Sequence, residues 1–310
     1  MTDKTDETKD YFDKNTEFWS SLFSDGVYGT AIQRVRIVSD KISDFLDSDF
    51  SDKPRTEYTH LDFGCGTGEL AANSASIGIR VIAVDIAPAM VSATKSAVNK
   101  EGSHNAQVYQ GGIGSLDDID TNSIDMFSAL GLIEYLTLSE LEIFLDNVAR
   151  ILRPNGRAYI GSRNRLFNIF SENKFTDLEV SLGQYEKLAA ELESIHKWIT
   201  EDCLLESLND VKQIEQFTDW VYPDQLPQTS PVSVSQRIQY SICDLSKRAI
   251  DNGFNIKDIY SIRYHPAKMT ILEPGTHSEL IDKINLTIDD YGDTKWALPC
   301  SSTYILELSK

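Results

Sequence analysis

The chain has 310 residues, and its 48 Asp and Glu outnumber its 29 Lys and Arg, which gives a formal net charge of −19. A hydrophobic content of 41% excludes a disordered chain, since a disordered chain lacks enough apolar surface to form a core. The shortage of cations argues against nucleic-acid binding, which depends on Lys and Arg that neutralise phosphates. The length allows one large decorated domain or two small ones.

The chain carries no recognisable targeting or membrane-spanning pattern. Residues 1–10 alternate Thr, Asp, Lys and Glu without an apolar core, unlike a signal or transit peptide. The most apolar window, 79–91, is interrupted by charged residues and proline and is shorter than the roughly 20 residues that span a bilayer. The four cysteines lie far apart, which predicts no metal site and a reducing compartment. We therefore expect a soluble cytoplasmic protein without a membrane partner.

From residue 60 onward, short apolar runs alternate with amphipathic stretches. Helices are expected at 69–77, from Pro88 onward, at 139–152 with a serine as N-cap, and at 245–252. Such alternation predicts an α/β fold with a mainly parallel sheet that is covered by helices on both faces. The expected strands are 60–63, 80–86, 106–110, 124–130, 157–162, 255–263 and 303–308.

The alternation stops between residues 164 and 240. Residues 177–198 have leucines at helical spacing, and 203–220 are helical or irregular. Connections in α/β units usually have about 2–6 residues, so this segment is expected to be an inserted helical cap that binds the acceptor of a reaction. Residues 41–57 are expected to link an N-terminal helix to the sheet. The predicted division is a tail and helical lid (1–57), a core (58–163 and 241–310) and the cap (164–240).

Three glycines at alternate positions, Gly64, Gly66 and Gly68, follow the first strand. Glycine suits a backbone that takes a positive φ or closely approaches a ligand, although a strand-to-helix turn without a ligand is the alternative. Asp85 ends the second strand, where an acid can accept hydrogen bonds from ribose hydroxyls. A dinucleotide-binding turn would have glycine at position 69, but this chain has Glu69. The pattern therefore favours an adenosine ligand other than NAD.

Several landmarks occur in the same order: 61–70, 84–86, 124–136 and 150–156. Together they resemble the class I S-adenosylmethionine-dependent methyltransferases. The resemblance implies a Rossmann-like, seven-stranded, mostly parallel sheet whose last strand is antiparallel. It also implies S-adenosylmethionine as cofactor and methyl transfer as activity.

The resemblance also implies roles for particular residues. Asp62 would hold the ammonium of the methionine part, Asp85 would take the ribose hydroxyls, and Leu130 would either offer its carbonyl to the ammonium or simply pack in its strand. Many members read the adenine edge with an acid after strand three; here backbone groups at 111–114 or Asp117 are the two candidates. The remaining predicted cofactor contacts from the core are Gly64, Cys65, Gly66, Ile86, Met90, Gly112 and Ile113.

The N-terminal segment resembles the opening of magnesium-protoporphyrin O-methyltransferases and related small-molecule enzymes, in which a helix lies over the cofactor. This resemblance rests on Tyr11, Phe12, Trp19 and residues 32–36, and it adds Tyr11, Trp19 and Arg36 to the predicted cofactor contacts. The alternative is an amphipathic helix that docks through its apolar residues.

Methyl transfer requires alignment and exclusion of water, and a base is optional. The candidate catalytic residues are His265 after strand six, His196 in the cap and Glu134 after strand four, although either histidine could be a surface or packing residue. Acceptor contacts are expected from four residues, Tyr135, Arg163, Asn164 and Arg165, of which the last two could instead begin the cap.

We expect methylation of an oxygen or nitrogen of a small molecule, with a sugar or an anionic metabolite as the candidate acceptor. The alternative is a non-catalytic S-adenosylmethionine-binding module or partner subunit.

Overall fold

The computed structural model describes residues 4–24, 30–48, 53–100, 105–223, 226–227, 234–235, 237–264 and 295–310. Its centre is a seven-stranded sheet with the order β3-β2-β1-β4-β5-β7-β6. The pairs between β1 and β2, β1 and β4, β2 and β3, and β4 and β5 are parallel, whereas β7 runs antiparallel to both neighbours. The predicted Rossmann-like sheet is thus confirmed. The strands are β1 (Thr59–Phe63), β2 (Arg80–Asp85), β3 (Ala106–Gln110), β4 (Ile124–Leu130), β5 (Leu152–Arg163), β6 (Asn255–Tyr264) and β7 (Ser301–Ser309).

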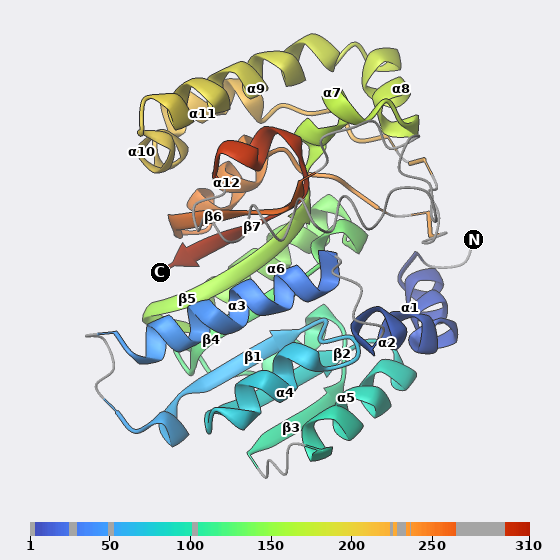
Figure 1. Cartoon of the computed structure of the whole chain (residues 1–310), viewed down its shortest axis with the longest axis vertical. Coiled ribbons are helices and arrows are strands. Elements are labelled where there is room, and N and C mark those ends of the chain that lie inside the picture. The colour runs from blue at the N-terminus through green and yellow to red at the C-terminus, as the bar shows by residue number, and fades with distance from the viewer. Residues whose placement is uncertain are drawn as a thin grey trace.

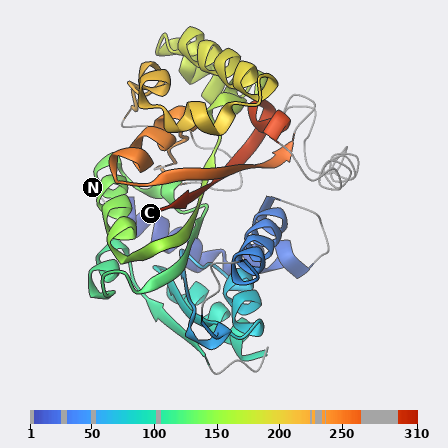
Figure 2. The ribbon, with the colours of Figure 1, turned by 90° about the vertical axis from the view of Figure 1, so that its left-hand side faces the viewer.

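Helices cover both faces of the sheet, as Figure 2 shows. One face carries α3 (Thr30–Leu46), α4 (Glu69–Ser76) and α5 (Pro88–Lys100). The other face carries α6 (Leu138–Ile151) and α12 (Ile242–Asp251). Each face has its own buried apolar cluster, because strand side chains alternate between the two sides.

Two N-terminal helices, α1 (Lys4–Lys14) and α2 (Thr16–Ser24), lie beside the carboxyl ends of β1 and β2 (Figure 1). The Asp13 carboxylate accepts a hydrogen bond of 2.8 Å from the backbone N–H of Ala89 in α5, which ties α1 to the core. The chain therefore brings its first helices to the sheet edge at which parallel α/β sheets bind ligands.

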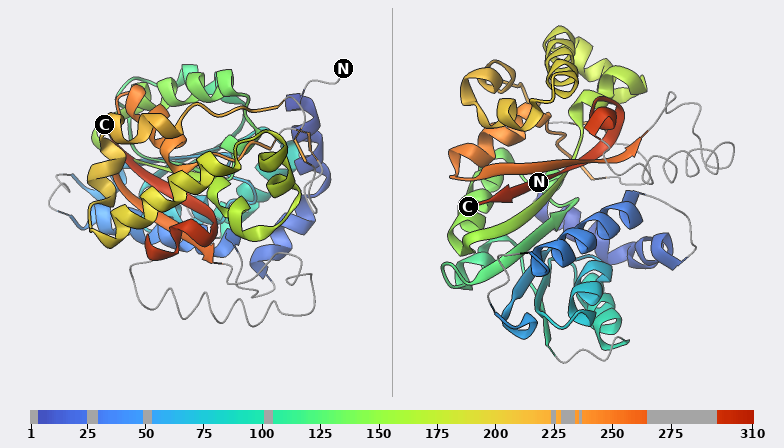
Figure 3. Two further views of the ribbon diagram at one scale, coloured as in Figure 1. Left: turned by 90° about the horizontal axis from the view of Figure 1, so that it is seen from above. Right: turned by 60° about the vertical axis from the view of Figure 1, so that its left-hand side comes forward.

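The cap forms a separate layer next to β6, β7 and α12 (Figures 1 and 3). Residues 177–198, predicted as one helix, belong to two helices that are separated by residues 182–184, where Gly183 has a φ of 66°. The cap helices are α7 (Asn168–Ser171), α8 (Lys174–Ser181), α9 (Tyr185–Thr200), α10 (Leu204–Asn209) and α11 (Val211–Ile214).

Some boundaries differ from the sequence-based expectation. The N-cap of α6 is Thr137 rather than a serine, because Thr137 and Glu140 form a reciprocal capping box. Helix α3 continues to Leu46, so the expected linker begins later than residue 41. Short 3₁₀ helices complete the connections: η1 (Arg55–Glu57), η2 (Ile113–Asp118), η3 (Ile133–Tyr135), η4 (Arg165–Phe167), η5 (Glu215–Phe217) and η7 (Lys295–Cys300).

Candidate active site

A cavity of about 610 Å³ lies at the carboxyl edge of the sheet. Its walls come from the ends of β1, β2 and β4, from residues 111–114, and from α1, α2 and α3. Arg163 at the end of β5, Ser302 and Thr303 at the start of β7, and residues that follow β1 and β4 or belong to β6 also line it. Nearly all of the predicted cofactor contacts line this cavity: Asp62, Gly64, Cys65, Gly66, Asp85, Ile86, Met90, Gly112, Ile113, Leu130 and Trp19.

The glycine turn between β1 and α4 has an unusual backbone. Gly64, Gly66 and Gly68 have φ values of 76°, 56° and 92°, a region that side chains disfavour. A Cβ on Gly68 would lie 2.7 Å from Cα of Thr94, so α4 and α5 can approach only with glycine at this position. The third glycine therefore serves packing between two helices, and position 69 is left for Glu69, which begins α4 and lines the cavity.

Asp85 is held by the backbone at the end of β2. Its carboxylate accepts hydrogen bonds of 2.9 Å from the N–H groups of Gly66 and Ala87. Burial raises the pKa of Asp85, while these backbone donors act in the opposite direction. Beyond it, Ile86, Met90 and the backbone of 111–114 line the cavity. Asp117, the other candidate for the adenine edge, is exposed and does not belong to the described lining.

Asp62 lies deeper, on β1, with an exposed fraction of 3%. The hydroxyl of Ser128 donates a hydrogen bond of 2.6 Å to its Oδ1. Burial raises the pKa of Asp62 to about 7, and the nearby carboxylates of Asp85 and Glu69 act in the same direction. The cavity thus gathers three carboxylates at one end, which suits a ligand that brings positive charge.

The cation that α3 brings to the cavity is Arg34, not Arg36. Arg36 is exposed and lies outside the described lining. Arg34 lines the cavity, and a Cβ on Gly131 would lie 2.5 Å from its Nη1. The helix explains the difference. Val38, Ile42 and Leu46 are buried at intervals of four residues on one face of α3, and Arg34 lies one further interval toward the N-terminus on the same face.

The N-terminal helices add aromatic side chains. Trp19 lines the cavity as predicted, but Phe12 lines it in place of Tyr11. The rings of Phe12 and Tyr135 meet edge to face at 5.3 Å between centroids. Tyr11 packs behind Phe12, with ring centroids 5.1 Å apart. Tyr135, a predicted acceptor contact, therefore stands in an aromatic wall that can exclude water.

Glu134 is engaged by two arginines. Its Oε2 lies 2.6 Å from Nε of Arg163 and 3.4 Å from Nε of Arg237, and its backbone carbonyl accepts a hydrogen bond of 2.7 Å from Ile238. Glu134 and Arg163 line the cavity. Because the Glu134 carboxylate is already committed to guanidinium groups, its arrangement suits a residue that orients Arg163 better than a general base.

Other predicted site residues lie elsewhere. The Asn164 side chain donates to the carbonyls of Leu298 and Ser301, at 2.7 and 2.9 Å, and so joins the cap to β7. Arg165 is buried in the cap against Glu179, with two hydrogen bonds of 2.8 Å. Neither belongs to the described lining of the cavity, so the structure does not support either as an acceptor contact, and the contacts of both are structural.

The structure does not bring His196, one of the two predicted catalytic histidines, to the described lining of the cavity. His196 is exposed on α9, on the outer layer of the cap, so its prediction as a catalytic residue is not supported. His265 lies outside the described residues.

Sequence reasoning missed Ser302, Thr303 and Arg263, which also line the cavity. The available signal was topological: since β7 is antiparallel, its first residues must lie at the edge where the parallel strands end. Thr303 indeed pairs with Arg163.

In the described part of the chain, no group of three or more His, Cys, Asp or Glu is placed to hold a metal ion. No described helix is both long and apolar enough to cross a membrane.

The fold and this cavity define a class. Residues 61–156 match the family described as a methyltransferase domain. Together with the seven-stranded sheet and its antiparallel β7, the match supports the predicted resemblance to the class I S-adenosylmethionine-dependent methyltransferases. The cofactor of this class is S-adenosylmethionine.

Curated relatives have the same domain. The chain is 30% identical over 112 residues to a ubiquinone biosynthesis O-methyltransferase from Bradyrhizobium diazoefficiens. The aligned region covers 36% of this chain and 42% of that protein. It is 27% identical over 158 residues to the protein of the same name from Rickettsia canadensis, covering 50% of this chain and 62% of that one. The chain thus spans about half the length of the curated relatives it matches.

Solved structures show the same fold over nearly the whole chain. The magnesium protoporphyrin IX methyltransferase from Synechocystis PCC 6803 with bound SAH has a TM-score of 0.55 at 16% identity, covering 99% of this chain and 100% of that one. A putative methyltransferase of Haloferax volcanii in complex with the activator Trm112 has a TM-score of 0.50 at 14% identity, covering 96% of both chains.

Proposed function

We propose that this chain transfers a methyl group from S-adenosylmethionine to an oxygen or nitrogen of a small molecule that carries an anionic group. The observation that carries the proposal is a cavity that brings the carboxylates of Asp62, Glu69 and Asp85 together and that is also lined by arginines and aromatic rings. We refer to the part with these three carboxylates as the carboxylate end.

The carboxylate end fits the cofactor. Asp62 would bind the ammonium of the methionine part, and Arg34 would pair with the carboxylate of the same part. Asp85 would accept from the ribose hydroxyls with the lone pairs that Gly66 and Ala87 leave available. The buried positions of Asp62 and Asp85, without an ion pair to Lys or Arg in the described residues, support binding of a cationic ligand.

The adenine end is flanked by Ile86 and Met90, and the backbone of 111–114 would meet the adenine edge. This arrangement accounts for the missing acid after β3, because N–H and carbonyl groups can serve the same edge without a carboxylate. Leu130, at the end of β4, lines the cavity, and its carbonyl would be a further acceptor for the ammonium.

The arginines and aromatic rings of the lining support an acceptor with an aromatic or apolar body and an anionic group. Phe12, Trp19 and Tyr135 offer apolar faces, and Arg163, oriented by Glu134, offers a guanidinium that suits a carboxylate or phosphate. The helices of the proposed cap lie away from the described lining, whereas Arg237 on its returning segment reaches Glu134. We therefore propose that the cap acts on the acceptor through this segment.

When bound, S-adenosylmethionine supplies an electrophilic methyl carbon on a positively charged sulfur. The role of this chain would be to align the acceptor with that carbon, to exclude water with the aromatic wall, and to neutralise the charge of the acceptor with Arg163. No side chain in this arrangement is required to act as a base.

Mass spectrometry of a metabolite extract tests the proposal. The purified chain and S-adenosylmethionine with an isotopically labelled methyl group are added, and species that gain one labelled CH₂ equivalent are sought. We expect an anionic species to gain the label with the wild-type chain and not with Asp85→Ala. Binding of the cofactor without any labelled product would contradict methyl transfer and favour a non-catalytic binding module.

A further inference from the structure

A buried chain of polar side chains runs beneath Asp62. His60 Nδ1 lies 2.9 Å from Oγ of Ser74, and His60 Nε2 lies 2.8 Å from Oγ of Ser128. Ser128 in turn donates to Oδ1 of Asp62 at 2.6 Å. These four residues are buried: the exposed fraction is 0% for His60 and Ser128, 2% for Ser74 and 3% for Asp62. Most polar groups buried to this degree are hydrogen-bonded, because an unpaired one costs free energy.

The sheet explains why these residues meet. His60 and Asp62 are two positions apart on β1, so both side chains point to the same face. Ser128 on β4 is the register partner of Asp62. Ser74 comes from α4, which covers that face. A hydrogen-bonded chain thus leads from a helix, across two strands, to a carboxylate in the cavity.

The direction of each hydrogen bond follows from the ionised form of Asp62. An ionised carboxylate only accepts, so the single proton of the Ser128 hydroxyl is used for Asp62. The Ser128 oxygen can then only accept from His60, which requires the proton of the imidazole on Nε2. Burial lowers the pKa of His60 to about 3, so the ring is neutral and has one N–H. Its Nδ1 must therefore accept from Ser74.

The surroundings of Asp62 make this donor important. Asp85 at the end of β2 and Glu69 at the start of α4 both disfavour a negative charge on Asp62, and burial does so more strongly. Cys65, also close by, has its thiol pKa raised well above its usual range and is neutral. Ser128 is the side chain whose hydrogen bond acts in the opposite direction.

We propose that His60 and Ser128 are positioning residues. They hold the Asp62 carboxylate oriented toward the cofactor through a chain of hydrogen bonds in which His60 donates to Ser128 and Ser128 donates to Asp62. The inference rests on the proposed function, because it gives Asp62 the role of ammonium ligand. Neither residue touches the cavity in the described lining.

Nitrogen-15 NMR of the imidazole tests the chain without any cofactor. At pH 8.5, where Asp62 is ionised, His60 is expected as the neutral tautomer with its proton on Nε2. A proton on Nδ1 under these conditions would overturn the proposal, because Ser128 would then have no proton left for Asp62.

Calorimetric titration with S-adenosylhomocysteine, the demethylated product of the cofactor, tests the function of the chain. Ser128→Ala is expected to bind about tenfold more weakly than wild type, a typical effect of removing a hydrogen bond to a charged group. Ser128→Thr, which keeps the hydroxyl, is expected to restore binding. His60→Gln, which keeps an N–H donor, is expected to bind more tightly than His60→Leu.

The pH profile separates positioning from simple loss of stability. Since the Ser128 hydroxyl lowers the pKa of Asp62, Ser128→Ala should shift the rise of affinity to higher pH. The matched control is Ser246→Ala. Ser246 is also a buried serine, but it lies in α12 and away from Asp62, so this substitution should leave the pH profile unchanged. Wild type without affinity would contradict both this inference and the proposed function, whereas equal affinities and profiles for wild type and Ser128→Ala would contradict this inference alone.

Discussion

The cavity and the cap both bury carboxylates, but they give them different partners. At the cavity, Asp62 accepts from a serine hydroxyl and Asp85 from two backbone N–H groups. In the cap, the Glu179 carboxylate receives two hydrogen bonds from Arg165, whose guanidinium also lies 4.4 Å from the ring centre of Trp220. The cap thus supplies its own cations, whereas Asp62 and Asp85 in the cavity accept from neutral donors. Glu134, which also lines the cavity, resembles the cap in being paired with arginines.

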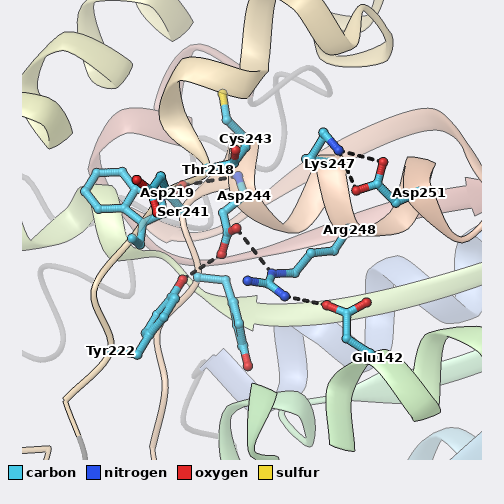
Figure 4. A network of polar contacts seen from close by, with 12 residues as sticks. Glu142, Thr218, Asp219, Tyr222, Ser241, Cys243, Asp244, Lys247, Arg248 and Asp251 are labelled. Carbon is cyan, nitrogen blue, oxygen red and sulfur yellow. Dashed lines mark hydrogen bonds and ion pairs between the residues drawn. The ribbon is translucent and has the colours of Figure 1, made fainter. Parts of the chain in front are cut away.

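The interface between the cap and α12 continues the pattern of internal pairing. Figure 4 shows Asp244 between Tyr222 and Arg248, with Arg248 reaching on to Glu142. Glu191 is the exception in the cap: its carboxylate accepts from the backbone N–H of Cys243 in the first turn of α12, where a helix favours negative charge. The comparison teaches that Glu179 is neutralised within the cap, while Asp62 and Asp85 have no such cation in the described residues and fit the proposed role of binding a cationic ligand.

The largest effect is expected from breaking the pair inside the cap. Arg165→Met should lower the free energy of unfolding by about 3–5 kcal/mol, because Glu179 would be left as an uncompensated buried charge. Urea unfolding measures the loss. The double variant Arg165→Met with Glu179→Met should recover most of it, and cofactor affinity should not change. A change in affinity that matches the loss of stability would contradict the division between the two regions.

A smaller loss of stability is expected from Glu134, which lies where the cavity meets the segment that returns from the cap. Glu134→Gln should lower the free energy of unfolding by about 2 kcal/mol, since Arg163 and Arg237 lose a charged partner but Arg163 can reach water. A positioning role predicts that S-adenosylhomocysteine affinity stays within about threefold of wild type, or less than 1 kcal/mol. Unchanged stability would show that the two ion pairs contribute nothing.

The two arginines of α3 sharpen the comparison on the cavity side. Arg34→Gln should weaken S-adenosylhomocysteine binding about tenfold or more, because a charge-assisted hydrogen bond is lost. Arg36→Gln is the matched control on the exposed face of the same helix and should bind like wild type. Equal affinities of the two variants would remove Arg34 from the proposed site. Calorimetry on both, at one ionic strength, decides between these results.

Binding of the cofactor product is also expected to depend on pH. The pKa of Asp62 is raised to about 7, so below that pH the carboxyl must lose a proton before it can bind an ammonium. Affinity for S-adenosylhomocysteine should therefore rise by up to about tenfold per unit between pH 5.5 and 7 and then level off. Asp62→Asn should remove this rise. A wild-type affinity that is flat from pH 5.5 to 7.5 would contradict the role of Asp62.

The fold could be predicted from sequence because its signals are local. Alternating apolar runs placed each strand within two residues of its ends, apart from β5, which begins five residues earlier than expected. The core of the site followed for the same reason: the glycine turn and Asp85 stand at strand ends, and the carboxyl ends of β1, β2 and β4 meet at one edge.

Side chains whose partners are distant in sequence could not be placed in this way. Asn164 bonds to Leu298 and Ser301, which lie 134 and 137 residues later in the chain. Arg165 finds Glu179 on a helix whose position no spacing reveals. The choice of Arg36 over Arg34 failed for another reason. The apolar residues at intervals of four, Val38, Ile42 and Leu46, were visible in the sequence and would have placed Arg34 on the buried face of α3.

The most direct test of the central claim is a calorimetric titration of S-adenosylhomocysteine into the wild-type chain, Asp85→Ala and Asp117→Ala at pH 7.5. The account predicts saturable binding to one site in wild type and in Asp117→Ala, whose exposed carboxylate lies outside the described lining. Asp85→Ala should lose at least about 100-fold in affinity, because hydrogen bonds from two ribose hydroxyls to a carboxylate disappear. Equal binding to all three chains, or no binding to wild type, would contradict the account.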